Sequence, residues 1–483
     1  MSLMAHSAVL PCANMAYWTL LAFGFSIALL KLVILHRFVL LSLFLPSCVL
    51  IGQSAPRDAV PSAPSGQTAP DSLQAPQSVP ETMPATMQDT SLVLSLADVV
   101  RMAEENNPRL HEALAASQRV KAAAHTARAY TNPSLEVFEG HQSARPIATP
   151  GVPGLLQHYA AYQTIEIPVE RRARQRAADT AVISSQFGQS AIMLSVTADA
   201  RRAFYNALRR REQIDHAREN LQLVQDLQRR VTVEVSVGEK GRLELTRAQA
   251  ELARAEFTLR SAQLEYVNAI ALLRLTIAAP AEANLDPRGT LEPSIVLPSL
   301  EQLRAEVLRT HPAVAQSQAD VQKARDALDH ERSLRIPQPT TFAEFENQPD
   351  LRFWRAGITV PIPLWDRRRG QIEEAKATIS QSAAMLDQRR LELISALERA
   401  YEQYQLADQQ TTSLESGSLR AAESAVDAAK AAYRFGERGI VEVLDAQRVL
   451  QSVRGDLVDA RFARQSALVD LEELGAVASK ARP

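Results

Sequence analysis

The sequence predicts a mainly α-helical fold that also forms a membrane β-barrel. Long coiled-coil helices are expected to build an α-helical barrel, and three chains with four strands each would form a trimeric twelve-stranded β-barrel. Three observations support this fold class. The chain is poor in aromatic residues (5%) and in glycine (17 of 483 residues), which is typical of long helices. Its second half repeats the order of features of its first half, and four short segments are strand candidates, with apolar and polar residues alternating in residues 158–168 and 351–363.

Export is the expected role of residues 1–54. A strongly apolar stretch spans residues 16–51, and the part after Arg37 is about 14 residues long, which is too short for an ordinary membrane-spanning helix and typical of a secretory signal. An uncleaved anchor is the alternative, and Met15 is an alternative start. Cys48 is a candidate for lipidation because residues 45–48 resemble a lipobox, with ordinary cleavage at residues 52–54 as the alternative.

Residues 55–90 are predicted to be a flexible tether, because their Pro-, Ser- and Ala-rich composition offers too little apolar surface to bury. The chain beyond them contains no cysteine, since Cys12 and Cys48 are its only two. A disulfide framework and a thiolate metal site are therefore excluded there. The net charge of −2 gives no indication of a nucleic-acid partner, which normally requires a basic excess.

The remainder of the chain is an internal duplication. A segment that ends at Asn107-Pro108 reappears 204 residues later and ends at His311-Pro312, and Gly238 reappears 198 residues later as Gly436. The order of features is kept over about 180 residues. We therefore assign a first structural repeat to residues 91–280, a linker to 281–299, a second structural repeat to 300–475 and a tail to 476–483.

Each repeat has the same predicted layout: a short helix ending before a proline, a medium helix, two strands around a loop, a very long helix, a glycine turn and a returning helix. No proline and one glycine lie between Pro168 and Gly238, so this helix would span roughly 105 Å. The returning helix (residues 242–279) and the next medium helix (313–335) would span roughly 57 and 34 Å. Stacked end to end, the two shorter helices nearly match the long one, as a tall cylinder of helices requires.

The returning helices show a coiled-coil pattern, with seam residues at alternating spacings of four and three. On this feature alone, an ordinary soluble antiparallel coiled coil is the simpler interpretation. The seam positions are Ala248, Leu252, Ala255, Leu259, Ala262, Tyr266, Ala269 and Leu273, then Ala446, Leu450, Val453, Leu457, Ala460, Ala467 and Leu471, with Arg464 as an exception.

Strands are predicted at residues 133–140, 158–168, 339–348 and 351–363. In the last of these, Trp354, Ala356, Ile358 and Val360 share one face. Such alternation matches a membrane barrel strand, apolar toward lipid and polar toward the lumen, and a soluble sheet packed on helices is the alternative. Four strands cannot close a barrel, and open edges cannot lie in lipid. If the strands lie in a membrane, three copies of the chain must therefore share them.

Together these features resemble the TolC-type outer membrane efflux protein family over residues 91–475. The two repeats, the Asn-Pro and His-Pro helix ends and the turns at Gly238 and Gly436 support the resemblance, and residues 360–370, VPIPLWDRRRG, are similar to its heavy-metal, CzcC-like branch. The resemblance implies a homotrimer with a β-barrel in outer-membrane lipid and a helical tunnel in the periplasm. Its implied partners are a periplasmic adaptor (membrane fusion) protein and an inner-membrane proton-driven transporter.

The implied function is that of the outer-membrane channel of a tripartite resistance-nodulation-division type efflux system. It would passively conduct exported substrate, with heavy-metal cations as the expected cargo. A drug- or solvent-exporting channel is one alternative. A periplasmic adaptor is the other, but adaptors have one helical hairpin and this chain predicts two. We found no phosphate loop, zinc signature or nucleophile elbow, so neither an enzyme nor a cofactor is expected.

The resemblance also suggests roles for residues at the helical turns. Glu442 and Asp445 share a helix face one turn beyond the second tip, where related channels have acidic residues that narrow the periplasmic entrance. Three chains would supply six carboxylates, which attract cations, although a solvated helix face is the alternative. Glu244 and Arg247 are the corresponding residues of the first repeat, and an Arg247–carboxylate pair between helices would hold the entrance shut.

Adaptor docking is expected at the tips themselves, where glycine permits the positive φ of a tight reversal. The tip residues are Val237, Gly238, Glu239, Lys240, Gly241, Phe435, Gly436, Glu437, Arg438 and Gly439. The histidines are dispersed along the chain without ligand spacing, so no metal site is expected.

Overall fold

The computed structural model describes residues 92–143, 153–291 and 294–477, which all belong to one compact unit beginning at Ala85. The export segment 1–54, the candidate Cys48, the tether 55–90 and the end of the tail lie outside the described residues. Among the helices of the described part, none combines the length and the apolar character that crossing a bilayer would require.

The predicted helices of both repeats are confirmed. The first repeat contains α2 (Leu96–Asn106), α3 (Pro108–Arg128), α4 (Pro168–Ser236) and α5 (Arg242–Thr276). The second contains α6 (Leu300–Thr310), α7 (Pro312–Ser333), α8 (Arg369–Ser413), α9 (Leu419–Arg434) and α10 (Ile440–Glu473).

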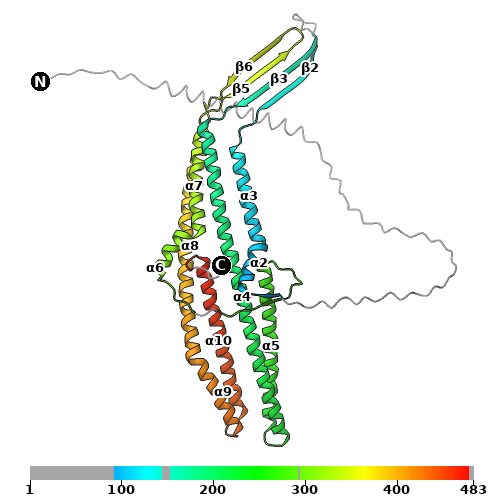
Figure 1. The fold of residues 1–483 in the computed structure, drawn as a ribbon, viewed down its shortest axis with the longest axis vertical. Coiled ribbons are helices and arrows are strands. Elements are labelled where there is room, and N and C mark those ends of the chain that lie inside the picture. The colour runs from blue at the N-terminus through cyan, green and yellow to red at the C-terminus, as the bar shows by residue number, and fades with distance from the viewer. Residues whose placement is uncertain (1–91, 144–152, 292–293, 478–483) are drawn as a thin grey trace, which may run out of the picture. The chain divides into compact units, whose positions relative to one another are not determined.

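Helix α4 is the longest element, and two shorter helices pack along it. It has 69 residues, whereas α5 has 35 and α7 has 22. Both α5 and α7 pack against α4, and Figure 1 shows α5 along its lower part and α7 along its upper part. The predicted stacking of a returning helix and a medium helix beside one long helix is therefore confirmed.

The coiled-coil seam is also confirmed in its main positions. Ala248, Ala255 and Leu273 are buried in α5, and Leu450 and Leu471 are buried in α10. Arg464, the exception in the predicted seam, is itself buried, and its guanidinium donates to Asp408 Oδ1 of α8 at 3.1 Å. A charge in the seam is tolerated because it has an acidic partner there.

The second of the two predicted very long helices is not one continuous α-helix. A π-helical turn, η1 (Leu414–Ser418), separates α8 from α9. A π-turn accommodates one extra residue and bends the helix locally. Its Glu415 accepts hydrogen bonds from Arg461 of α10 at 2.8 and 2.9 Å, so the turn is fixed to the neighbouring helix.

Equivalent side chains cap α3 and α7 in the two repeats. The Asn107 side chain accepts a hydrogen bond from the Arg109 backbone N–H at 2.9 Å, and His311 Nδ1 accepts one from the Ala313 backbone N–H at 3.1 Å. Each helix then begins with a proline, whose missing N–H costs nothing at the first helical position. His311 is 8% exposed, and its burial lowers the pKa of the imidazole.

We expect the His311 cap to make stability depend on pH. The folded state binds a proton at His311 more weakly than the unfolded chain does, so this contribution is present above the unfolded pKa of about 6.5 and is lost as pH falls through the folded pKa. In His311→Asn, which copies the Asn107 cap, the melting temperature should fall less between pH 7.5 and 5.5 than in the unmodified protein. An identical pH dependence would contradict this expectation.

The sheet consists of four antiparallel strands: β2 (Ser134–Gln142), β3 (Gly154–Thr164), β5 (Thr340–Asn347) and β6 (Arg352–Thr359), in the order β2-β3-β5-β6. All four predicted strands are confirmed, with ends shifted by a few residues. The central β3–β5 pair joins the two repeats, and the outer strands β2 and β6 each leave one edge unpaired within the described chain. Figure 1 shows the sheet at one end of the helices.

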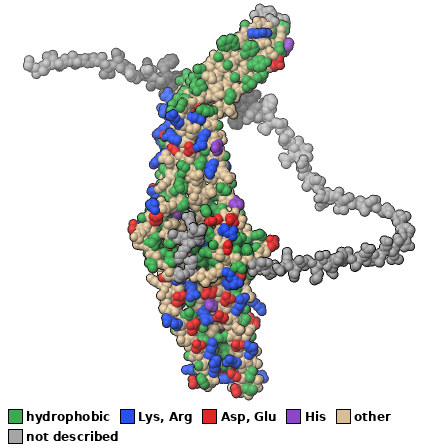
Figure 2. Space-filling view, viewed as in Figure 1, with side chains coloured by type: hydrophobic (Ala, Val, Ile, Leu, Met, Phe, Trp, Pro, Cys, Tyr) green, Lys and Arg blue, Asp and Glu red, His purple; other side chains and the backbone are tan. Residues whose placement is uncertain are grey.

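The two faces of the sheet differ in polarity, as the predicted alternation requires. One face exposes a row of Val137, Tyr159, Phe345 and Trp354 and, beside it, a row of Leu135, Ala161, Ala343 and Ala356. Leu135 is 75% exposed and Trp354 is 79% exposed. The opposite face contains Glu136, His158, Glu344 and Arg355. Figure 2 shows apolar side chains over the sheet, whereas charged side chains gather over the helices.

An exposed row of apolar side chains on one face, with charged side chains such as Glu344 buried on the other, is the reverse of a soluble sheet and matches strands that meet lipid. On the polar face, one glycine lies directly beneath an aromatic ring. The Phe342 ring lies over Gly357, and a Cβ at that position would come within 2.8 Å of the ring. The glycine therefore makes room for an aromatic side chain between neighbouring strands.

A parallel strand pair at the middle of the helices was not predicted. β1 (Leu92–Leu94) pairs with β4 (Leu285–Pro287), which lies within the predicted linker 281–299. Further along the linker, the Ile295 backbone N–H donates to the Tyr404 hydroxyl at 2.7 Å, and that hydroxyl donates to Ile295 O at 2.9 Å. The linker is thus attached to both repeats rather than free.

Candidate functional site

The two helical tips have the same backbone structure. After α4, Gly238 adopts φ +83°, the Glu239 N–H donates to Glu234 O at 2.9 Å and the Gly238 N–H donates to Val235 O at 3.2 Å. After α9, Gly436 adopts φ +72° with matching bonds from Glu437 to Ala432 O and from Gly436 to Tyr433 O. Both are Schellman motifs, which end a helix with a left-handed glycine. The predicted tight reversals are therefore confirmed.

Each tip exposes one large apolar side chain. Val237 is 65% exposed and Phe435, at the matching position of the second tip, is 81% exposed. Behind these turns, a buried cluster joins the two hairpins: Leu227, Val231, Ala248, Tyr433, Ile440, Val443 and Leu444. The tips are therefore fixed to each other by an apolar core, while their ends offer apolar contacts to the outside.

The predicted acidic pair lies on an exposed face of α10. Glu442 and Asp445 are exposed, whereas their neighbours Val443 and Leu444 are buried in the cluster that joins the hairpins. Arg438 lies 3.9 Å from Glu442, and Arg448 lies 2.9 Å from Asp445. Each carboxylate thus has an arginine beside it, at an exposed position where such pairs contribute little to stability.

The corresponding residues of the first repeat lie in different surroundings. Glu244 is half-buried and Arg247 is exposed, and within the described part of the chain Arg247 forms no ion pair. Near the tips, Arg448 bridges the hairpins, with its guanidinium 2.7 Å from Glu251 of α5. Sequence reasoning missed this residue, although its position three residues after Asp445 places both side chains on one face.

A partly buried hydrogen bond also connects the hairpins near the tips. The Tyr433 hydroxyl donates to Glu234 Oε2 at 2.5 Å. Burial, the hydrogen bond to Glu234 and the negative charges of Glu234 and Glu244 raise the pKa of the Tyr433 hydroxyl well above its usual range. The hydroxyl therefore remains a donor throughout the pH range in which proteins function.

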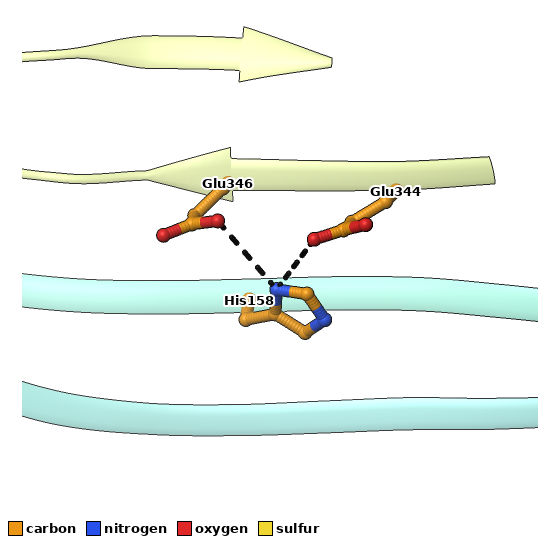
Figure 3. A group of neighbouring side chains, drawn as sticks. All are labelled: His158, Glu344 and Glu346. Atoms are coloured by element: carbon orange, nitrogen blue, oxygen red, sulfur yellow. Dashed lines mark ion pairs between the residues drawn. The ribbon is translucent and has the colours of Figure 1, made fainter. Parts of the chain in front are cut away.

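A second group of polar residues lies far from the tips, on the polar face of the sheet. His158 of β3 lies close to Glu344 and Glu346 of β5 (Figure 3). This group could not be predicted from the sequence, because His158 is more than 180 residues away from the two glutamates and meets them only across the β3–β5 pairing. The spacing of metal-binding residues along the sequence can reveal ligands on one helix or strand, but not ligands that come together from two strands.

Comparisons with known proteins agree with this arrangement. Residues 303–476 match the family model described as outer membrane efflux protein. The cobalt-zinc-cadmium resistance protein CzcC of Cupriavidus metallidurans is 24% identical over 292 residues, covering 60% of this chain and 70% of the relative. The pyoverdine export outer membrane protein OpmQ of Pseudomonas aeruginosa is 24% identical over 311 residues, covering 62% of this chain and 65% of the relative.

The fold is also that of solved channel structures. One of these is CusC, whose crystal structures describe conformational changes that accompany folding and transmembrane channel formation. It superposes with a TM-score of 0.69 at 18% identity, covering 78% of this chain and 91% of that one. The fold and the relatives are those of channel-forming transport proteins with a β-sheet domain and a helical tunnel, which are not enzymes. Residues 303–476 match the outer membrane efflux protein family, and the chain is an outer-membrane efflux channel, located in the outer membrane with its helices in the periplasm. It is the outer-membrane channel component of a tripartite efflux system, a class that works with adaptor and inner-membrane transporter partners.

Proposed function

We propose that three copies of the chain form a passive channel that conducts heavy-metal cations from the periplasm to the outside, as part of a resistance-nodulation-division type system. The observation that supports the homotrimer is the open sheet. β2 and β6 each have one unpaired edge beside the two apolar rows that contain Trp354 and Ala356. An unpaired edge in lipid costs several kcal/mol for each bare backbone group, and pairing β2 of one copy with β6 of the next removes both edges.

Support for metal cargo comes from CzcC, the relative named for cobalt, zinc and cadmium resistance. A second candidate cargo, a small organic molecule, is supported by the similarity to the pyoverdine exporter OpmQ. Specificity for one of the two would arise mainly in the inner-membrane transporter, which we propose to be proton-driven, because a passive duct gains nothing from holding its cargo tightly.

Deleting the gene and measuring growth on a panel of metals and organic compounds tests the cargo. We expect the deletion strain to become sensitive to divalent cobalt, zinc or cadmium, and the intact gene to restore tolerance. Sensitivity to organic compounds alone, with unchanged metal tolerance, would contradict the metal assignment and favour the second candidate.

Adaptor docking is proposed for the tip residues Val237 to Gly241 and Phe435 to Gly439. The argument rests on the matched exposure of Val237 and Phe435 beside rigid Schellman turns. An apolar side chain held on a fixed turn loses little conformational freedom on binding. The periplasmic adaptor would therefore contact two similar tips from each chain.

A gate is proposed one helical turn above the tips. Glu442 and Asp445 point away from the buried cluster that joins the hairpins, so in a threefold assembly their carboxylates would line the entrance with Glu244 and Arg247 of the first repeat. Six carboxylates in a narrow opening attract cations and exclude anions. Arg438 and Arg448 lie beside them and can exchange these contacts when the entrance opens.

We expect Glu442→Ala combined with Asp445→Ala to increase single-channel conductance and to weaken cation preference, because the carboxylate ring is removed. Currents through planar bilayers, with reversal potentials in a salt gradient, measure both quantities. The matched control is Asp456→Ala with Asp459→Ala, an exposed acidic pair of the same spacing on the same helix, about 21 Å farther from the tip. Currents that are unchanged in the first variant would exclude the gate.

A further inference from the structure

We infer that His158, Glu344 and Glu346 form a binding site for a divalent metal cation on the polar face of the sheet (Figure 3). His158 Nδ1 lies 3.4 Å from an oxygen of Glu344 and 3.9 Å from an oxygen of Glu346. One ligand atom from each residue lies within 4.8 Å of the other two. The register explains the grouping, since His158 pairs directly with Glu346, and Glu344 is the next residue on the same face.

The distances suit a small divalent ion. Zn²⁺ binds imidazole nitrogen at about 2.0–2.1 Å and carboxylate oxygen at about 2.0–2.2 Å in tetrahedral geometry, which separates neighbouring ligand atoms by about 3.4 Å. The His158–Glu344 separation already has this value, and the His158–Glu346 separation exceeds it by half an ångström. A bound ion would need to draw Glu346 Oε2 closer to His158 by about that amount.

Neighbouring side chains orient all three ligands. The Phe138 ring stacks on the His158 imidazole with centroids 4.3 Å apart and planes 12° from parallel. Arg355 donates to both oxygens of Glu344 at 2.7 and 2.8 Å. Gln348 Nε2 donates to Glu346 Oε1 at 2.5 Å, which leaves Oε2 facing the histidine. Such supporting bonds hold metal ligands in position.

The ligand set selects a class of ion. One imidazole and two carboxylates suit borderline and hard divalent ions such as Zn²⁺ and Co²⁺, whereas monovalent copper and silver prefer the sulfur of cysteine or methionine. Three protein ligands leave at least one position for water, so a bound ion can exchange. The positive charge of Arg355 beside Glu344 opposes the cation and keeps binding weak.

The position of the site suggests a use in transport. Glu346 is next to the last residue of β5, before the turn at residues 348–351, and His158 is close to the start of β3, so both lie toward the end of the sheet that is distant from the helices. In the channel proposed above, this is the outer mouth. The role as a transit point for exported cations rests on that proposed function, whereas binding itself does not.

Metal titration of the full-length protein in detergent tests the inference. With Co²⁺, we expect a visible absorption band that saturates at one ion per chain and is displaced by Zn²⁺. His158→Gln and Glu346→Gln should each weaken Co²⁺ binding about tenfold or more, as the loss of groups that hold a metal does. His141→Gln and Glu139→Gln, which lie on the opposite face of the same sheet, are matched controls and should leave binding unchanged.

Absence of saturable Co²⁺ binding in the unmodified protein would overturn the inference. Co²⁺ binding by Glu346→Gln as tight as that of the unmodified protein would also overturn it. Glu346 is more exposed than the other two ligands, so its variant is the one expected to fold most readily. The result is separable from the cargo experiment. Metal sensitivity of a deletion strain without Co²⁺ binding would remove only this site, whereas Co²⁺ binding without metal sensitivity would remove only the metal cargo.

Discussion

Ala356→Arg is expected to remove most of the folded protein from the outer membrane. Ala356 is exposed in the row that also contains Leu135, Ala161 and Ala343, near the middle of β5 and β6. In lipid, a guanidinium at the midplane of a barrel strand costs about 2–4 kcal/mol per chain. Refolding into lipid vesicles across a denaturant series measures this loss of stability, and the amount in outer-membrane fractions should fall in parallel.

The control for this variant is Ala356→Leu, which adds comparable bulk at the same position without a charge. A larger apolar side chain that faces lipid should be tolerated. Phe353→Arg tests the other face of the same strand, where the native Arg355 already pairs with Glu344, and it should also cost little. If Ala356→Arg and Ala356→Leu refold equally well, this face does not meet lipid.

Phe204→Ala is expected to lower the free energy of unfolding by about 3–5 kcal/mol, the range for removing a buried phenylalanine. Phe204 is 2% exposed. It lies in the buried cluster that joins α4 to α2, α5 and the β1–β4 pair, and it contacts Tyr205 edge-on with ring centroids 5.6 Å apart. The cavity would therefore open where the two strands attach to the helices.

Thermal unfolding followed by circular dichroism measures the effect of Phe204→Ala. Phe435→Ala is the matched control, because it removes the same side chain at a helical tip where the ring is 81% exposed. We expect its melting temperature to stay close to that of the unmodified protein. Equal destabilisation by the two variants would show that the cluster around Phe204 is not where stability is concentrated.

Much of the fold was predictable because the signals are local. The run without proline between Pro168 and Gly238 specified α4, and the alternation around Trp354 and Ile358 specified β6 and its apolar face. The glycines at both tips indicated the Schellman turns. Each of these features depends on residues within a few positions of one another, where backbone preference and burial act together.

Other features depend on partners that are distant in the sequence. β1 and β4 have three residues each and are stabilised by pairing across more than 190 residues, so neither has a periodic signal of its own. The residues of the π-helical turn at Leu414–Ser418 have a sequence pattern that is equally compatible with a continuous α-helix. The group around His158 forms only after β3 and β5 have paired, and the Arg448–Glu251 bridge likewise requires two packed helices.

The two bare sheet edges have a consequence for genetics. If β2 of every copy must find β6 of another before either can enter lipid, insertion and association are a single step, and one faulty copy blocks its two partners. A variant damaged at β2 or β6 should therefore be dominant when co-expressed with the intact gene. The yield of channels should fall as the cube of the intact fraction rather than in direct proportion to it.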